Sequence, residues 1–174
     1  MESLAVRKRV LLIDDDPRVC ASLKMVLEPI YDILQAGDGQ EGLDVFRKDE
    51  PDLILLDVIL PGTDGLAVLQ TLRMESKMTP VIMLTGTKSV KTAVDAMKFG
   101  AADYLSKPFD VDELRIIIDR VLNSSELERE VKQLRAQVVQ RYAFHNLIGK
   151  SQVMQEIYSK IEQVADSRTT VLIT

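Results

Sequence analysis

The sequence predicts an α/β fold in which five parallel strands form a doubly wound sheet, followed by an extended C-terminal linker helix. Short runs rich in Val, Ile and Leu alternate with amphipathic segments of helical length, and five such units fit into residues 5–123. Alternating strands and helices favour a parallel sheet, because each parallel connection has to cross over, usually through a helix. Right-handed crossovers then place helices on both faces of the sheet.

The five expected strands are short apolar runs bounded by residues that are typical of turns. They span residues 10–13, 31–36, 53–56, 81–84 and, more weakly, 104–105. Strands of a parallel sheet are continuously apolar in this way because helices cover them on both sides. We therefore expect these strands to be buried on both faces.

The expected helices carry their apolar residues on one side. They span residues 19–27, 41–47, 66–72 and 90–99, and a fifth helix spans residues 112–122. In the first of them, Val19, Leu23, Val26 and Leu27 fall on one helical face. The single cysteine, Cys20, lies on the same helix, and we expect it to be a small core residue.

Charge and composition exclude several classes of partner. The 174-residue chain has 22 basic and 27 acidic residues, a formal net charge of -5 and a pI of about 5.0. Binding to nucleic acid or to an anionic membrane needs a basic surface, so we expect neither partner for this chain. No apolar stretch is long enough to cross a bilayer, and the amino-terminal MESLAVRKR lacks the apolar core of a signal peptide. We therefore expect a cytoplasmic protein.

Carboxylates follow the first and third expected strands. Asp14 and Asp15 end the first strand, and Asp57 ends the third. Binding sites in parallel α/β sheets lie beyond the carboxyl ends of the strands, so the three side chains converge if these strands are neighbours. They could share protons with raised pKa values, or hold a hard divalent cation such as Mg²⁺ or Mn²⁺. A carboxylate beside such a cation could attack a phosphoryl group.

Two more polar side chains follow the fourth and fifth strands. Thr85 ends the fourth strand, and Lys107 follows the fifth. A hydroxyl and an ammonium at these positions could bind phosphoryl oxygens and neutralise the charge that develops during in-line transfer. We expect the Lys107–Pro108 peptide bond to be cis, which would bring the lysine back over the crevice.

Together these motifs have a family resemblance. Asp14–Asp15, Asp57, Thr85 and Lys107–Pro108 occur in this order, each at a strand end, and the pattern resembles the receiver domain of bacterial two-component response regulators. The resemblance covers residues 6–123, and we assign residues 1–123 to this domain. It implies a flavodoxin-like (CheY-like) fold with strand order 2-1-3-4-5, and phosphorylation of Asp57 from a phosphohistidine on a sensor kinase.

The resemblance also implies a metal site. Asp15 and Asp57 would bind Mg²⁺ directly, Asp14 would bind it through water, and the backbone carbonyl of Ile59 would be a further ligand. Asp16 matches no ligand position of the family. We expect it to cap the helix that begins at Pro17, because a carboxylate there accepts from the free N–H groups.

A conformational switch is implied as well. Phosphorylation would draw Thr85 toward the phosphoryl group, and Tyr104 would turn inward behind it, which alters the face made by the fourth helix, fifth strand and fifth helix. Gly86 is small and leaves room for a phosphodonor. Ile59 is apolar where the family often has a polar residue, and Thr87 occupies another position that influences hydrolysis. We therefore expect slow self-dephosphorylation.

Residues 124–144 are expected to form a helical linker. Its apolar residues follow an a/d spacing that is compatible with a two-stranded coiled coil: Leu127, Val131, Leu134 and Val138. Glu130 and Arg135 would then pair between two parallel chains. We expect a homodimer through this linker and through the face of the fourth helix, fifth strand and fifth helix; a single solvated helix, or one packed on its own domain, is the alternative.

Residues 145–174 carry a second resemblance, in NLIGKSQVMQEIYSKIEQVADSRTTVLIT. This stretch resembles the opening of the AAA+ ATPase domain of sigma-54-dependent transcription activators of the nitrogen-regulator type, and predicts a turn, a helix and a strand at 169–174. The resemblance implies that a longer parent protein hydrolyses ATP, binds DNA and remodels sigma-54 RNA polymerase, whereas this chain would not. Gly149-Lys150-Ser151 is not a P-loop, because Phe144 stands where the first glycine belongs.

Other functions fit some of these residues. Phosphohydrolases of the haloacid dehalogenase type use a D-x-D-x-[TV] motif, for which Asp14 and Asp16 qualify, but Arg18 replaces the last residue. Phe109-Asp110 is also a poor match to their second acidic metal site. Turnover of a generic aryl phosphate would separate this enzyme from a signalling switch. An unphosphorylated scaffold is a further alternative, which an Asp57→Asn substitution without effect would favour.

Overall fold

The computed structural model describes residues 7–86, 90–144, 147–148 and 151–165. The chain divides into two units, Met1–Leu127 and Glu128–Thr174. Thr87 and the strand expected at 169–174 lie outside the described residues, as do Gly149 and Lys150.

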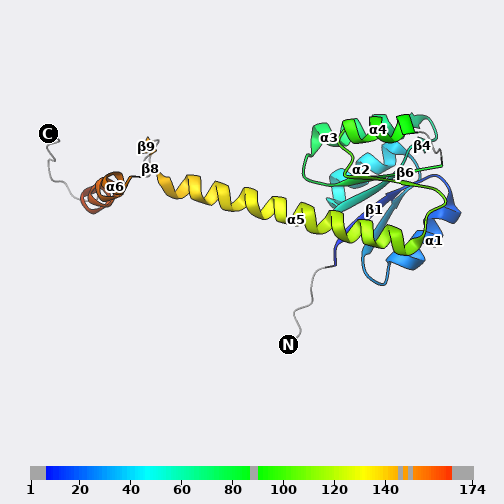
Figure 1. Ribbon diagram of the computed structural model, residues 1–174, viewed down its shortest axis with the longest axis horizontal. Coiled ribbons are helices and arrows are strands. Elements are labelled where there is room, and N and C mark those ends of the chain that lie inside the picture. Colours follow the sequence, from blue (N-terminus) through cyan, green and yellow to red (C-terminus); the bar gives the residue numbers. More distant parts are fainter. Residues whose placement is uncertain (1–6, 87–89, 145–146, 149–150, 166–174) are drawn as a thin grey trace. The chain divides into compact units, whose positions relative to one another are not determined.

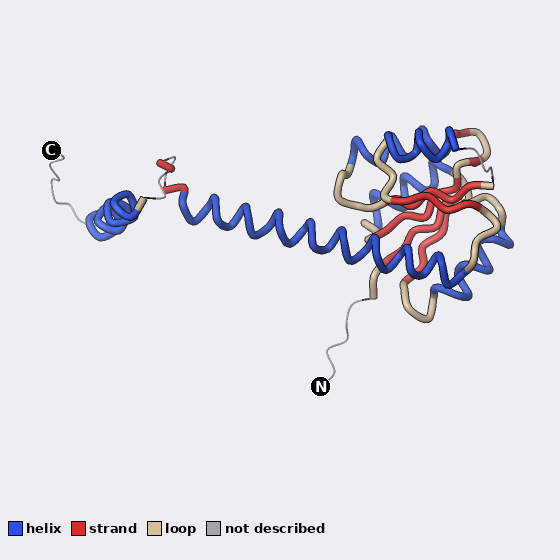
Figure 2. The backbone as a smooth tube through the Cα atoms, in the orientation of Figure 1, coloured by secondary structure: helices blue, strands red, loops and turns tan. Residues whose placement is uncertain are grey.

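The first unit contains a five-stranded parallel sheet (Figure 2). Its strands are β1 (Arg9–Ile13), β2 (Asp32–Ala36), β3 (Leu53–Asp57), β6 (Val81–Thr85) and β7 (Asp103–Ser106). They lie in the order β2-β1-β3-β6-β7, and all four pairings are parallel. The predicted order 2-1-3-4-5 is thereby confirmed, because these are the five expected strands in sequence.

Helices cover both faces of this sheet (Figure 1). The helices are α1 (Pro17–Leu27), α2 (Gly39–Asp49), α3 (Gly65–Glu75), α4 (Val90–Lys98) and α5 (Val111–Tyr142). Side chains of α1 and α5 pack on one face of the sheet, and side chains of α2, α3 and α4 pack on the other. Alternate residues of β1 and β3 enter the two cores, as the twofold repeat of a strand requires.

The two edge strands differ from the prediction. β3 and β6 are buried along their whole length, and β1 along nearly all of it. β2 and β7 each keep only one buried residue, Ala36 and Leu105. The expectation that all five strands are buried on both faces was therefore wrong for β2 and β7, because an edge strand has a neighbour on one side only.

Helix starts are set by capping side chains. Asp16 accepts a hydrogen bond from the Arg18 N–H at 2.9 Å, with Pro17 in the first turn, which confirms its predicted capping role. Asp38 caps α2 and Asp64 caps α3 in the same way. The expected ranges began at later residues of these helices, because periodicity detects the buried face and not the polar first turn.

Two short hairpins had no counterpart in the prediction. β4 (Ile59–Leu60) pairs antiparallel with β5 (Thr63–Asp64), and Gly62 between them has a φ of 73°. In the second unit β8 (Ala143–Phe144) pairs antiparallel with β9 (Leu147–Ile148). Two-residue strands are too short to show a periodic pattern.

The remaining predicted helices are present. α5 runs without a break from Val111 to Tyr142, so the fifth helix and the linker form one element. The expected helical linker 124–144 was wrong for its last two residues, which form β8. Leu127, Val131 and Leu134 of the apolar repeat are exposed, whereas the side chain of Val138 lies outside the description. The helix expected in residues 145–174 is α6 (Gln152–Ala165).

Candidate functional site

The predicted acidic residues meet at the carboxyl edge of the sheet. β1 lies between β2 and β3, so the strand order reverses there, and binding sites of α/β sheets form at such a point. Asp14 follows β1 and Asp57 ends β3. One carboxylate oxygen each of Asp14, Asp15 and Asp57 lies within 4.8 Å of the others. The predicted convergence of the three side chains is confirmed.

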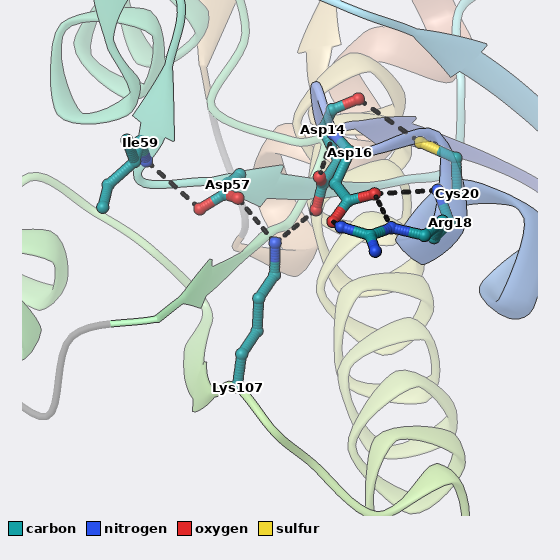
Figure 3. A network of polar contacts seen from close by, with 7 residues as sticks. All are labelled: Asp14, Asp16, Arg18, Cys20, Asp57, Ile59 and Lys107. Carbon is teal, nitrogen blue, oxygen red and sulfur yellow. Dashed lines mark hydrogen bonds and ion pairs between the residues drawn. The ribbon is translucent and has the colours of Figure 1, made fainter.

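Two of these carboxylates are buried, and their oxygens have hydrogen-bond donors. Asp14 is 1% exposed and Asp57 is 6% exposed, whereas Asp15 is exposed. Oδ1 of Asp14 accepts from the Asp16 N–H at 3.0 Å, and Oδ1 of Asp57 accepts from the Ile59 N–H at 3.1 Å (Figure 3). Buried carboxylates need such donors, because removal from water without them is costly.

Lys107 supplies the positive charge between the two buried carboxylates. Its Nζ lies 2.5 Å from Oδ2 of Asp14 and 2.5 Å from Oδ2 of Asp57 (Figure 3). Desolvation lowers the pKa of Lys107, but the hydrogen bonds and charges of Asp14 and Asp57 outweigh it and hold the pKa above its ordinary value. The ammonium therefore stays charged at neutral pH.

The main chain places Lys107 at this position. Its N–H donates at 2.6 Å to the carbonyl of Thr85, the last residue of β6. The Lys107–Pro108 peptide bond is cis, as predicted. Thr85 is fully buried at the end of β6, next to β3, so it lies on the same edge of the sheet as Asp57.

Tyr104 does not join the carboxylates. It is half-buried on β7 and packs against the core on the α2, α3 and α4 side. Together with Val94, Met97 and Asp103 it lines a surface hollow between α4 and β7. Tyr104 thus lies at the surface between α4 and β7, where a change in its side-chain position would alter the contacts between these two elements.

Ile59 and Gly86 follow two residues of the site, Asp57 and Thr85. The Ile59 side chain is 61% exposed and points away from the Asp57 carboxylate (Figure 3). A Cβ at Gly86 would meet no atom within 4 Å. Gly86 thus places no side chain next to Thr85.

Two neighbours of the site had roles that the sequence did not reveal. The Cys20 thiol is half-buried, as expected of a small core residue, but it also donates to the Asp14 carbonyl at 3.3 Å (Figure 3). Burial, with the charge of Asp14, raises the pKa of this thiol. Gly65 lies against the main chain of Asp57, where a Cβ would come within 2.1 Å of the Asp57 carbonyl oxygen. The Asp64-Gly65 pair is a turn signal that could have drawn attention to it.

Comparison with known proteins identifies the family. The sequence model of the response regulator receiver domain matches residues 10–119. The chain belongs to this family. Receiver domains are the phosphoryl-accepting modules of two-component regulation, so the signalling interpretation is favoured over the phosphohydrolase alternative. Among the described residues, no helix is both long and apolar enough to span a membrane.

Several relatives match nearly all of the chain. It is 32% identical over 167 residues to the regulatory protein AtoC of Escherichia coli K12, and 34% identical over 167 residues to the nitrogen assimilation regulatory protein NtrX of Azorhizobium caulinodans. These alignments cover 95% and 94% of this chain but 36% of each relative. The chain therefore spans about a third of the length of these curated relatives.

Solved structures show the same fold. A CheY-like receiver domain protein from Methanospirillum hungatei superposes with a TM-score of 0.68 and 31% identity, over 70% of this chain and 98% of that chain. NtrX from Brucella abortus, in complex with ADP, superposes with a TM-score of 0.71 and 31% identity, over 93% of this chain and 35% of that chain. The CheY-like fold expected from the sequence is confirmed.

Proposed function

We propose that Asp57 is the phosphoryl acceptor of this receiver domain, and that the phosphodonor is a phosphohistidine of a sensor kinase. The observation that carries the proposal is the ammonium of Lys107 between the buried carboxylates of Asp14 and Asp57, 2.5 Å from each. Such a cation can hold a phosphoryl oxygen as the group arrives, because it already balances the charge at the acceptor.

The transfer is an in-line displacement. An oxygen of Asp57 forms a bond to phosphorus while the bond from phosphorus to the histidine nitrogen breaks, and the electron pair stays on the imidazole. Lys107 exchanges part of its contact with the carboxylates for a phosphoryl oxygen. The Thr85 hydroxyl, which is on the same sheet edge, donates to another.

The carboxylates also fit a divalent cation. Asp14, Asp15 and Asp57 offer hard oxygen ligands within 4.8 Å of one another. The Lys107 ammonium contacts only Asp14 and Asp57, so a cation would balance the remaining negative charge of the cluster. Asp14, Asp15, Asp57 and the backbone carbonyl of Ile59 would hold Mg²⁺ or Mn²⁺. When bound, the ion would neutralise charge on the phosphoryl oxygens.

The output is a change in self-association. Phosphorylation draws Thr85 toward the phosphoryl group, and Tyr104 turns inward and reshapes the face of α4, β7 and α5. The exposed apolar residues of α5, Leu127 and Leu134 among them, support a homodimer through the linker. The relatives named as regulatory proteins support a regulator as the parent, and the C-terminal resemblance supports a sigma-54-dependent transcription activator.

Intact mass after incubation with Mg²⁺ and acetyl phosphate tests the acceptor. We expect one phosphoryl adduct on the wild-type chain and none on Asp57→Asn. Released phosphate is measured in the same tube. Phosphate release without an adduct would favour a phosphohydrolase, and neither product, with Mg²⁺ binding demonstrated, would contradict the proposal.

A further inference from the structure

The amino end of α3 lies against the main chain of Asp57. A Cβ added to Gly65 would lie 2.1 Å from the Asp57 carbonyl oxygen, 2.8 Å from the Val58 Cα and 2.9 Å from the Val58 carbonyl oxygen. These distances are far below van der Waals contact, and main-chain atoms cannot turn away as the end of a long side chain can. In this backbone, therefore, only glycine fits at position 65.

Hydrogen bonds close the loop between Asp57 and α3. The Gly65 N–H donates to the Val58 carbonyl at 2.9 Å, and the Val58 N–H donates to the carbonyl of Leu84 in β6 at 2.9 Å. Ile59 pairs antiparallel with the residue just before Gly65. The loop is thus held to the sheet at one end and to α3 at the other.

The same loop supplies a hydrogen bond to the Asp57 carboxylate. The Ile59 N–H donates to Oδ1 at 3.1 Å, while Oδ2 accepts from Lys107 Nζ at 2.5 Å (Figure 3). A carboxylate turns as a rigid plane, so a donor on one oxygen also sets the direction of the other. The loop therefore sets the orientation of the Asp57 carboxylate plane, and with it the direction of the oxygen that faces Lys107.

We infer that Gly65 is a positioning residue for Asp57. Its lack of a side chain lets the loop close onto the strand, and the closed loop holds the Ile59 N–H on Oδ1 so that Oδ2 is directed at Lys107. Gly65 touches no reacting atom and acts through Ile59. Its importance for phosphorylation rests on the proposed role of Asp57 as acceptor, whereas its effect on the carboxylate does not.

The test compares Gly65→Ala with Gly100→Ala in the full chain. Gly100 has a φ of 92° and precedes β7, at the edge of the sheet away from Asp57, so alanine there strains the backbone without touching the site. We expect both variants to lower the thermal midpoint. Only Gly65→Ala should slow phosphorylation by acetyl phosphate, by about tenfold or more, since a misplacement of 1 Å can cost about 100-fold.

A spectroscopic readout separates positioning from loss of stability. The Ile59 amide resonance should differ between the wild type and Asp57→Asn, because its acceptor changes from a carboxylate to an amide oxygen. In Gly65→Ala it should move away from the wild-type position, and in Gly100→Ala it should stay. A folded Gly65→Ala with the wild-type rate and an unchanged Ile59 resonance would overturn the inference.

A second variant covers the case in which Gly65→Ala does not fold. Ile59→Pro removes the N–H and keeps Gly65 in place, and the inference requires the same loss of phosphorylation rate; a wild-type rate would refute it. If the wild-type chain itself takes no phosphoryl group, the proposed function fails. The Ile59 resonance in Gly65→Ala then decides the positioning role alone.

Discussion

At the residue scale, we predict that Ile59 influences the lifetime of the proposed phosphoryl group on Asp57. Its side chain is exposed two residues after Asp57 and has no polar atom that could orient an attacking water. We predict that phospho-Asp57 persists well beyond seconds, and that Ile59→Asn shortens its lifetime. Phosphate release from the isolated phosphorylated chain measures this, with the remote exposed Ile30→Asn as control. A wild-type lifetime of seconds would contradict the prediction.

Lys107 is the cation that two buried carboxylates share. Removing one partner of a buried ion pair costs about 3–5 kcal/mol, and we expect about 2–3 kcal/mol for Lys107→Met because the Lys107 side chain keeps 19% exposure. Urea denaturation without added metal measures the loss. Mg²⁺ should restore part of it, because the ion can balance the same carboxylates.

The exposed Lys48→Met is the matched control for this substitution. It should change the free energy of unfolding little, with or without Mg²⁺. Equal losses in the two variants, or no effect of Mg²⁺ on Lys107→Met, would show that the Lys107 ammonium does not balance Asp14 and Asp57 as described.

At the scale of elements, side-chain hydrogen bonds attach α5 to segments that precede strands β2 and β6 and to α1. The Tyr31 hydroxyl, just before β2, donates to Asp119 of α5 at 2.5 Å. Arg115 of α5 donates to the Val26 carbonyl at 2.9 Å, and Ser125 of α5 donates to the Met78 carbonyl at 3.1 Å. These bonds join α5 to α1, to β2 and to the segment before β6.

The Tyr31–Asp119 pair makes part of this attachment dependent on pH. Burial, then the hydrogen bond and charge of Asp119, raise the pKa of Tyr31 above its ordinary value of 10.0. The folded chain thus holds this proton more tightly than the unfolded chain. The contribution to stability is complete below pH 10 and falls as pH rises above 10. Denaturation of wild type and Tyr31→Phe between neutral pH and pH 11 measures it; parallel stability curves would contradict the prediction.

At the scale of the whole molecule, the proposed self-association depends on the apolar repeat on α5. Leu127, Val131 and Leu134 are 62%, 39% and 53% exposed in the single chain. We predict that Leu127→Ser with Leu134→Ser shifts the chain toward monomer in light scattering, because two apolar positions of the seam are lost. This double variant should still be phosphorylated on Asp57 by acetyl phosphate.

Gln133 offers a control for the linker prediction. It is exposed and lies outside the a/d positions, so Gln133→Ser should leave the oligomeric state unchanged. A wild-type chain that is monomeric both with and without phosphorylation would contradict the prediction and favour the single solvated helix.

The succession of strands and helices along the chain was predictable because each element carries its own periodic pattern, whereas the order of the strands in the sheet came from the family resemblance. The strand ends were predicted to within one residue, and Asp57 followed as the last residue of β3. Burial of the strands was less predictable: residues 33 and 34 of β2 are as apolar as those of β1, yet they are only partly buried. Position at the edge of the sheet decides this, and it is a property of the assembled sheet.

The sequence by itself determined the fold, and the identity of the residues at the site, because Asp14, Asp15, Asp57 and Lys107 each end or follow a strand. Parallel strands carry such residues to one edge whatever the details of packing. Only the tertiary structure decided how they are arranged: which carboxylates are buried, that Lys107 bridges two of them, and that Gly65 meets the main chain of Asp57. Those features depend on the distances between residues of different strands, loops and helices. A local sequence pattern contains no information about such distances.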